Sequence, residues 1–223
     1  MDGDGARSAD GTRDDQRTHP GRYRGLLVDF GGVLTSSVIG SFQAFCESEG
    51  LAADAIFERL VADPVARKLV VDLECGRIDE AAFEPGLATA LGVQANGLID
   101  RLFAGMLPEP EMPGVVLAAR RAGIRTGLLS NSWGAGRYDR DRFGELFDGV
   151  VISGEVGLRK PDPAIYALGA RSIGVEPDAC VFVDDFPHNL EPARTLGMAT
   201  VHHTDPARTA AALEILLGVP LRS

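Results

Sequence analysis

Short runs of apolar residues alternate along the chain with longer stretches in which apolar residues recur every three or four positions. A short apolar run is typical of a buried strand, whereas the second spacing is typical of a helix with one buried face. The pattern predicts strands at residues 26–29, 124–129, 150–152, 180–183 and 199–201.

Helical spacing fills most of the intervals between these predicted strands. The expected helices lie at residues 114–122, 139–147, 163–173, 190–196 and 206–217. Strands and helices in alternation predict an α/β fold with a doubly wound, parallel, Rossmann-like sheet. Such sheets bind their ligands at the carboxyl ends of the strands, so chemistry is expected there.

The segment 37–108 contains no good strand pattern and is predicted to be a helical cap inserted into this core. The core itself then comprises residues 21–36 and 109–223, and the polar segment 1–20 is expected to be a flexible tail. The turn at Glu74–Asp79 is expected to end one helix and begin another, as in a lid. We expect eleven apolar residues to pack as the core of the cap rather than to contact a ligand: Phe42, Phe45, Ile56, Phe57, Leu60, Phe83, Leu87, Leu91, Leu98, Leu102 and Phe103.

Composition and charge narrow the classes of partner. The chain has 223 residues, 45% of them hydrophobic, and a formal charge of −10. An acidic surface argues against nucleic-acid and anionic-membrane partners, and no apolar run reaches membrane-spanning length. The three cysteines, Cys46, Cys75 and Cys180, are expected to be buried, reduced thiols, because no further Cys or His lies at metal-ligand spacing. We therefore expect a cytoplasmic protein, either monomeric or homodimeric.

Acidic residues end two of the predicted strands. Asp29 closes one apolar run just before a glycine pair, and Asp184 and Asp185 close another. A desolvated carboxylate is costly unless a partner neutralises it, and a second acidic strand end adds like charge. If the two strand ends meet, the cluster calls for a divalent cation. A solvated acidic turn or a helix cap remains the alternative for one Asp, but explains two less well.

Four sequence motifs occur in a fixed order along residues 24–203. They read DFGGVL at 29–34, LLSNS at 128–132, GLRKPDPAIY at 157–166 and VDDFPHN at 183–189, the last followed by Gly197 and Met198. Together they resemble the haloacid dehalogenase (HAD)-like hydrolase superfamily, in which a helical cap separates the first two motifs. The resemblance implies a hydrolase that cleaves a small phosphorylated metabolite.

The resemblance also implies roles for particular residues. Asp29 would be the nucleophile that forms an aspartyl-phosphate, while Ser130 and the backbone N–H of Asn131 would bind phosphate oxygens. Lys160 would contact both a carboxylate and the phosphate, and it is one of only two lysines in the chain, the other being Lys68. For Ser130 a turn-forming role, and for Lys160 a surface position, are the plainer alternatives.

By the same resemblance, Mg²⁺ would be held by Asp29, the Gly31 carbonyl and Asp185, with Asp184 in support. Asn189 would orient Lys160 or Asp184, although an ordinary helix-surface position suits an Asn equally well. Trp133 would wall the substrate pocket or pack against the cap. No chemistry is assigned to His188, His202 or His203.

Gly31 is the departure from the family pattern. Phosphatases of this superfamily usually carry a second Asp at this position as general acid and base, a group typically worth about 10²–10⁴ in rate. Its loss leaves two alternatives open: a metal-independent 2-haloacid dehalogenase-like hydrolase, and a weakened domain that binds a phosphorylated ligand. The acidic pair Asp184 and Asp185 favours the phosphatase. We also expect Gly31→Asp to raise the rate if the pocket can hold the side chain.

Overall fold

A computed structural model describes residues 21–221 of the chain, and the predicted tail at 1–20 lies outside these residues. Five parallel strands form one sheet in the order β3-β2-β1-β4-β5. Each predicted strand is present, with ends shifted by no more than one residue. The bounds are β1 Gly25–Val28, β2 Arg125–Ser130, β3 Gly149–Ile152, β4 Cys180–Asp184 and β5 Ala199–His202. The predicted α/β fold with a doubly wound parallel sheet is therefore confirmed.

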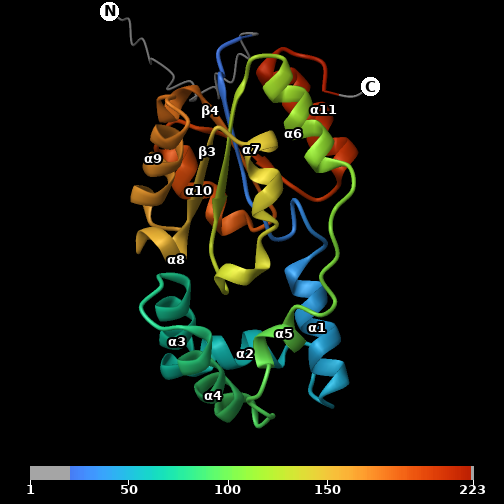
Figure 1. The fold of residues 1–223 in the computed structure, drawn as a ribbon, viewed down its shortest axis with the longest axis vertical. Helices are drawn as coiled ribbons and strands as arrows, with labels where there is room; N and C mark the ends of the chain where they lie inside the picture. The colour runs from blue at the N-terminus through green and yellow to red at the C-terminus, as the bar shows by residue number, and fades with distance from the viewer. Residues whose placement is uncertain (1–20, 222–223) are drawn as a thin grey trace, which may run out of the picture.

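Helices cover both faces of this sheet (Figure 1). On one face α6 (Met112–Arg121) and α11 (Pro206–Leu217) pack over β1 side chains such as Leu26 and Val28. On the other, α9 (Pro163–Ser172) and α10 (Pro187–Thr195) pack over Leu27. Successive strand residues point to opposite faces, so a strand covered on both sides must be apolar throughout. This explains why β1 reads as one uninterrupted apolar run, with all four residues buried.

A separate group of helices lies between β1 and α6 in the sequence and forms the lower part of the molecule in Figure 1. Asp63 and Asp79 cap the third and fourth of them by accepting hydrogen bonds from backbone N–H groups of the first turn. The bounds are α1 Val38–Ser48, α2 Ala55–Ala62, α3 Pro64–Glu74, α4 Glu80–Leu91 and α5 Leu98–Leu102. The predicted turn after Glu74 is thus present between α3 and α4.

The two segments that join this helical layer to the sheet run side by side. Thr35 and Pro108 form an antiparallel bridge, and the N–H of Ser36 donates to the carbonyl of Leu107 at 2.7 Å. The division of the chain at 36/37 and 108/109 stays a prediction, and this pairing agrees with it. Within residues 21–221, no helix is both long enough and apolar enough to cross a membrane.

The predicted helix at 139–147 is wrong in extent. The structure has a 3₁₀ turn at Arg140–Arg142, a single helical turn α7 at Phe143–Leu146, and an extended Phe147. Arg120 from α6 donates to the Gly144 and Glu145 carbonyls, which ends the helix from outside. The remaining elements are short: α8 at Ser153–Val156 and 3₁₀ turns at Ala135–Arg137 and Pro177–Ala179.

The apolar residues predicted for the cap core divide into two groups. Eight of the eleven are buried in one cluster, and Phe57, Leu60 and Phe103 are only partly buried against it. Four of the eleven, however, also border a cavity: Phe42, Phe57, Leu60 and Phe103. The three cysteines are buried and free, as predicted.

Candidate functional site

The two acidic strand ends meet because their strands are neighbours. Strands β1 and β4 are parallel, with Val28 opposite Val183, and the N–H of Asp29 donates to the Val183 carbonyl at 2.9 Å. Asp29 and Asp184 therefore leave the sheet at the same level. Both are buried, with 7% and 0% of their surface exposed.

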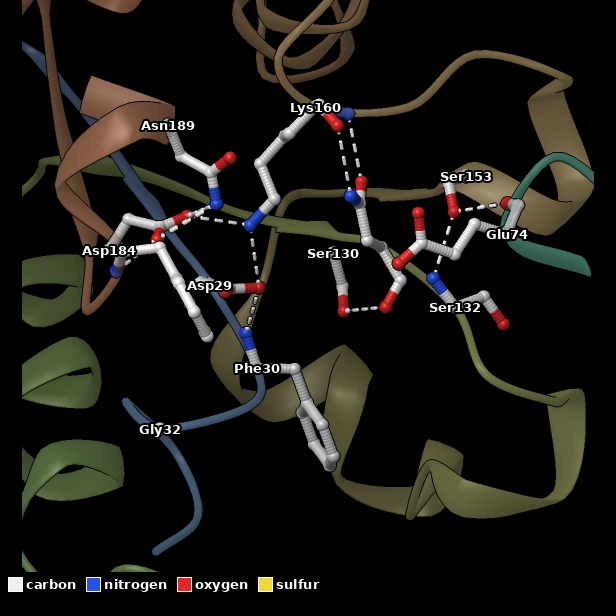
Figure 2. A network of polar contacts seen from close by, with 12 residues as sticks. Asp29, Phe30, Gly32, Glu74, Ser130, Ser132, Ser153, Lys160, Asp184 and Asn189 are labelled. Atoms are coloured by element: carbon white, nitrogen blue, oxygen red, sulfur yellow. Dashed lines mark hydrogen bonds and ion pairs between the residues drawn. The ribbon is translucent and has the colours of Figure 1, made fainter. Parts of the chain in front are cut away.

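Lys160 lies between these two carboxylates (Figure 2). Its Nζ is 2.9 Å from Asp29 Oδ1 and 2.6 Å from Asp184 Oδ2, and its side chain is 1% exposed. Asn131 holds the lysine backbone: the Lys160 N–H donates to Asn131 Oδ1 at 2.8 Å, and Asn131 Nδ2 donates to the Lys160 carbonyl at 3.1 Å. The Asn131 side chain thus positions Lys160, a contact that the sequence did not predict.

Asp184 is the most extensively hydrogen-bonded member of the cluster. Besides Lys160, it accepts hydrogen bonds from the Phe186 N–H at 2.8 Å and from Asn189 Nδ2, which is 3.0 and 3.1 Å from its two oxygens (Figure 2). Asn189 is held in turn, since its carbonyl accepts from the Tyr166 hydroxyl at 2.7 Å. Asp184 is therefore suited to fixing Lys160 in place.

The Asp185 carboxylate is less fully hydrogen-bonded than the Asp184 carboxylate. The Asp185 Oδ1 atom is buried with no hydrogen-bond partner among the described residues. One carboxylate oxygen from each of Asp29, Asp184 and Asp185 lies within 4.8 Å of the others. An unpaired buried oxygen beside two further carboxylates is costly, so this corner of the site requires a positive partner besides Lys160.

The pKa shifts in the cluster also indicate an excess of negative charge. Burial raises the pKa of Asp29 to about 8, with Lys160 acting against the rise and Asp184 adding to it. Burial, and next the charge of Asp184, raise the pKa of Asp185 to about 6. Burial alone would lower the pKa of Lys160, but Asp184 and Asp29 outweigh it and raise that pKa. One ammonium thus balances the carboxylates incompletely.

The residues present fit a hard divalent cation. Carboxylate and backbone carbonyl oxygens are the ligands that Mg²⁺ prefers. The loop after Asp29 approaches closely, because a Cβ on Gly32 would overlap the Asp185 carboxylate and the φ of Gly32 is +74°. Only glycine allows this approach without strain. Among the described residues, the carboxylates close enough to share such an ion are Asp29, Asp184 and Asp185, and a role for the Gly31 carbonyl stays a prediction.

Ser130 ends strand β2, next to β1, and its hydroxyl is paired with a residue that sequence reasoning missed. Ser130 Oγ lies 3.0 Å from the Tyr138 hydroxyl, and the Tyr138 ring packs on Phe30 with centroids 4.8 Å apart. Burial raises the pKa of Tyr138, so its phenol keeps its proton and can orient the serine. Tyr138 sits in an irregular loop, where no periodicity marks it.

Asp29, Ser130 and Lys160 border a cavity of about 330 Å³ between the sheet and the cap helices. Seven aromatic residues line it: Phe42, Phe57 and Phe103 from the cap, Trp133 from the loop beside it, and Phe30, Tyr138 and Phe186 from the core. Trp133 both borders the cavity and packs in the cap, with ring centroids 5.2 Å from Phe42 and 5.5 Å from Phe83. Trp133 therefore packs against the cap and borders the cavity, and its contact with a substrate stays a prediction.

Glu74, at the end of α3, joins the cap to the core. Its carboxylate accepts from Trp133 Nε1 at 3.0 Å and pairs with Arg159, while its carbonyl accepts from the Ser153 hydroxyl (Figure 2). Burial raises the pKa of Glu74, with Arg159 acting against it. Its position as the last residue of a predicted helix gave no sign of these contacts.

Replacing Glu74 by Ala is expected to lower the free energy of unfolding by about 1–3 kcal/mol, because Trp133 Nε1 and the partly buried Arg159 lose their acceptor. Chemical denaturation checks this. Glu155→Ala is the matched control: it also removes a carboxylate paired with an arginine, Arg140, but both side chains are about half exposed. The control should cost less than about 1 kcal/mol. Equal losses in the two variants would contradict the linking role of Glu74.

A cap residue occupies part of the space that an Asp side chain at position 31 would need. A Cβ built on Gly31 would lie 2.8 Å from Cγ2 of Val38, the first residue of α1. A short β-branched side chain cannot easily swing aside. The sequence showed the glycine, but not the neighbour that stands against a larger residue there.

Comparisons with known proteins bear on this site. A family model described as "haloacid dehalogenase-like hydrolase" matches residues 23–197. The chain is 36% identical over 149 residues to bifunctional epoxide hydrolase 2 of Sus scrofa, which covers 64% of this chain but 27% of that protein. It is 32% identical over 122 residues to a glyceraldehyde 3-phosphate phosphatase of Methanopyrus kandleri, covering 53% of this chain and 51% of the relative. The chain thus spans about half or less of the length of these relatives.

Solved structures share the fold. A HAD family enzyme from Bacteroides thetaiotaomicron, in complex with magnesium and inorganic phosphate, superposes with a TM-score of 0.60 at 23% identity, over 82% of this chain and 94% of that one. A dehalogenase structure superposes with a TM-score of 0.62 at 20% identity, over 90% of this chain and 98% of that one. Both likenesses concern the fold.

Proposed function

This chain belongs to the haloacid dehalogenase-like hydrolase family, and we propose that it is a Mg²⁺-dependent phosphatase that acts through an aspartyl-phosphate on Asp29. The observation that carries the proposal is the buried Oδ1 of Asp185, beside Asp29, which has no hydrogen-bond partner within residues 21–221. A cation would satisfy this oxygen, and a metal-independent dehalogenase would not need one. Similarity to a glyceraldehyde 3-phosphate phosphatase supports the reaction class.

The contacts of Asp29 support different roles for its two oxygens. Oδ1 accepts hydrogen bonds from the Phe30 N–H at 2.7 Å and from Lys160 at 2.9 Å, which leaves Oδ2 to attack phosphorus. As the new O–P bond forms, the bond from phosphorus to the leaving oxygen breaks, and the electron pair departs with that oxygen. Water then attacks phosphorus and releases Asp29 as a carboxylate.

The neighbouring residues position the phosphoryl group. Lys160 holds Asp29 through one oxygen and offers its remaining charge to a phosphate oxygen, while the Ser130 hydroxyl donates to another. Trp133 and the cap helices exclude water from the cavity, which strengthens each charge contact. When bound, Mg²⁺ held by Asp29, Asp185 and the Gly31 carbonyl would neutralise phosphate charge and bring the phosphoryl group to Asp29.

The test is phosphate release from a panel of phosphate monoesters by the full chain, with Mg²⁺ and then with a chelator. We expect release with Mg²⁺ and its loss on chelation. Halide release from 2-haloacids, measured in parallel, is expected to be absent. Halide release that a chelator does not affect, or no phosphate release from any ester, would overturn the proposal.

Mg²⁺ should stabilise the protein, and Asp185 should be required for this effect. A ligand that binds only the folded state stabilises it by about 2.7 kcal/mol at a hundredfold excess over its Kd. We expect Mg²⁺ to raise the melting temperature of the wild type but not of Asp185→Asn. Asp141→Asn, an exposed aspartate changed in the same way, is the control and should respond like the wild type. An equal Mg²⁺ response from Asp185→Asn would remove Asp185 from the ion site.

Restoring an acid at position 31 should succeed only when space is made for it. Because Val38 Cγ2 lies 2.8 Å from a Cβ at Gly31, Gly31→Asp alone should gain little, whereas Gly31→Asp with Val38→Ala should raise kcat, up to about 10²-fold on esters of poor leaving groups. Val38→Ala alone is the control. Steady-state kinetics check this, and a double variant no faster than the control would contradict our account of the missing acid.

A further inference from the structure

The cavity beyond the phosphate position is walled mainly by apolar side chains. The cap and the loop at Trp133 contribute four aromatic residues, and the core adds Phe30, Tyr138 and Phe186. The other apolar lining residues are Val38, Leu60, Val70 and Met106. Aromatic walls of this kind favour a flat ring, which packs edge-on or in offset stacks against them. A volume of about 330 Å³ suits a small ligand.

The charged side chains around this apolar part already have partners. Glu74 accepts from Trp133 and Arg159, while Arg137 donates to Asp100 at 2.7 Å and lies over the Phe103 ring, 4.9 Å from its centroid. Recognition of a polyhydroxylated leaving group needs polar side chains that are free to bind hydroxyls. Among the described lining residues beyond the acidic cluster, few such groups remain, the exposed His188 being one.

The chemistry at position 31 gives an independent argument. Gly31 has no proton to donate, and Val38 stands against a larger residue there. A leaving oxygen must then depart without its proton, which is far easier for a phenol, with a pKa of about 10, than for an alcohol, with a pKa of roughly 16. The aromatic cavity wall and the absence of an acid at position 31 therefore both favour an ester whose leaving group is a phenol.

Building on the proposed function, we infer that the preferred substrates are aryl phosphate monoesters, with the aromatic ring seated between the Phe42, Phe103 and Trp133 side chains. In the first step, Asp29 Oδ2 forms its bond to phosphorus as the bond from phosphorus to the aryl oxygen breaks. The departing phenolate carries away the electron pair and takes its proton from water. No acid from the protein is needed.

Three esters separate the two arguments: 1-naphthyl phosphate, 1-naphthylmethyl phosphate and glycerol 1-phosphate. The first two share the ring system but differ in leaving group, while the last two share an alkyl leaving group but differ in polarity. With Mg²⁺, we expect kcat/KM, which reports the step in which the leaving group departs, to be at least about tenfold higher for the first than for the second. The KM for glycerol 1-phosphate should be at least about tenfold higher than that for 1-naphthylmethyl phosphate. In the double variant Gly31→Asp with Val38→Ala, the ratio of kcat/KM for 1-naphthyl phosphate to that for 1-naphthylmethyl phosphate should fall.

Trp133 supplies a readout that does not depend on turnover, since it is the only tryptophan in the chain and borders the cavity. Phenylphosphonate, which cannot be hydrolysed, should change the tryptophan fluorescence in the presence of Mg²⁺, whereas methylphosphonate at the same concentration should change it much less. Phe103→Ala should weaken the phenylphosphonate response.

The outcomes distinguish this inference from the function on which it rests. Equal kcat/KM values for the two naphthyl esters, or a preference for glycerol 1-phosphate, would overturn the aryl assignment and leave the phosphatase intact. Equal fluorescence responses to the two phosphonates would overturn it as well. Absence of Mg²⁺-dependent release from all three esters and from the wider panel would overturn both.

Discussion

Asp29→Asn is expected to abolish Mg²⁺-dependent phosphate release, lowering kcat by at least about 10⁴-fold. An amide is a far weaker nucleophile than a carboxylate, and removal of a nucleophile typically costs this much or more. The substitution keeps the shape of the side chain, so the loss reports on chemistry rather than on packing. Phosphate release by the purified variants checks the prediction, with Asp141→Asn as the control that should keep wild-type activity.

Two further measurements distinguish loss of the nucleophile from loss of the fold. In the presence of a chelator, Asp29→Asn should unfold at a denaturant concentration no lower than the wild type, because Asp29 and Asp184 are buried carboxylates that share one lysine. After acid quench during turnover, the intact wild-type protein should gain the mass of one phosphoryl group, and the variant should not. Turnover that survives Asp29→Asn would refute the assignment of the nucleophile.

Lys160→Met is expected to be costly to both stability and activity. Methionine has a similar length but no charge, so Asp29 and Asp184 would be left buried and unpaired. Breaking a buried ion pair in this way typically costs about 3–5 kcal/mol of stability. Loss of a preorganised charge that faces the phosphate should also lower kcat by about 10²–10³-fold. Denaturation curves and steady-state kinetics of the variant measure the two effects.

Lys68 offers a matched control, because it is the only other lysine in the chain. Its side chain is 74% exposed and pairs with Asp72 on the same helix. Lys68→Met should therefore cost no more than about 1 kcal/mol and leave kcat unchanged. Lys160→Arg should not restore activity, since a planar guanidinium does not replace a compact ammonium between two carboxylates. Full activity in Lys160→Arg would contradict the tight seat inferred for the ammonium.

The sheet and its acidic edge were predictable from local pattern. Each strand is a short apolar run, and each lies within one residue of its predicted place. Parallel strands that alternate with helices bring their carboxyl ends to one edge, so residues that end neighbouring strands meet. Asp29 and Asp184 come together for this reason, although their residue numbers differ by 155. Their chemical roles stay predictions.

The roles of the apolar cap residues were harder to predict from local pattern. Helical spacing identified Phe42, Phe57, Leu60 and Phe103 as apolar positions on helix faces, and we expected all of them to pack in the core of the cap. The structure packs these four in or against the cap cluster, as expected, but it also places them at the cavity wall. Periodicity shows that a face avoids water, but a second helix and a ligand cavity satisfy that requirement equally well.

By itself, the sequence determined where each strand lies along the chain, the family to which the chain belongs, and which acidic residues stand at the ends of β1 and β4. These features depend on short-range pattern. Only the tertiary structure decided which side chains from distant segments meet: Val38 against Gly31, Tyr138 against Ser130, and Glu74 against Arg159. Such contacts depend on how the cap is seated over the sheet. That arrangement results from many apolar contacts summed over both surfaces, and it leaves no mark on the residues next to each partner in the chain.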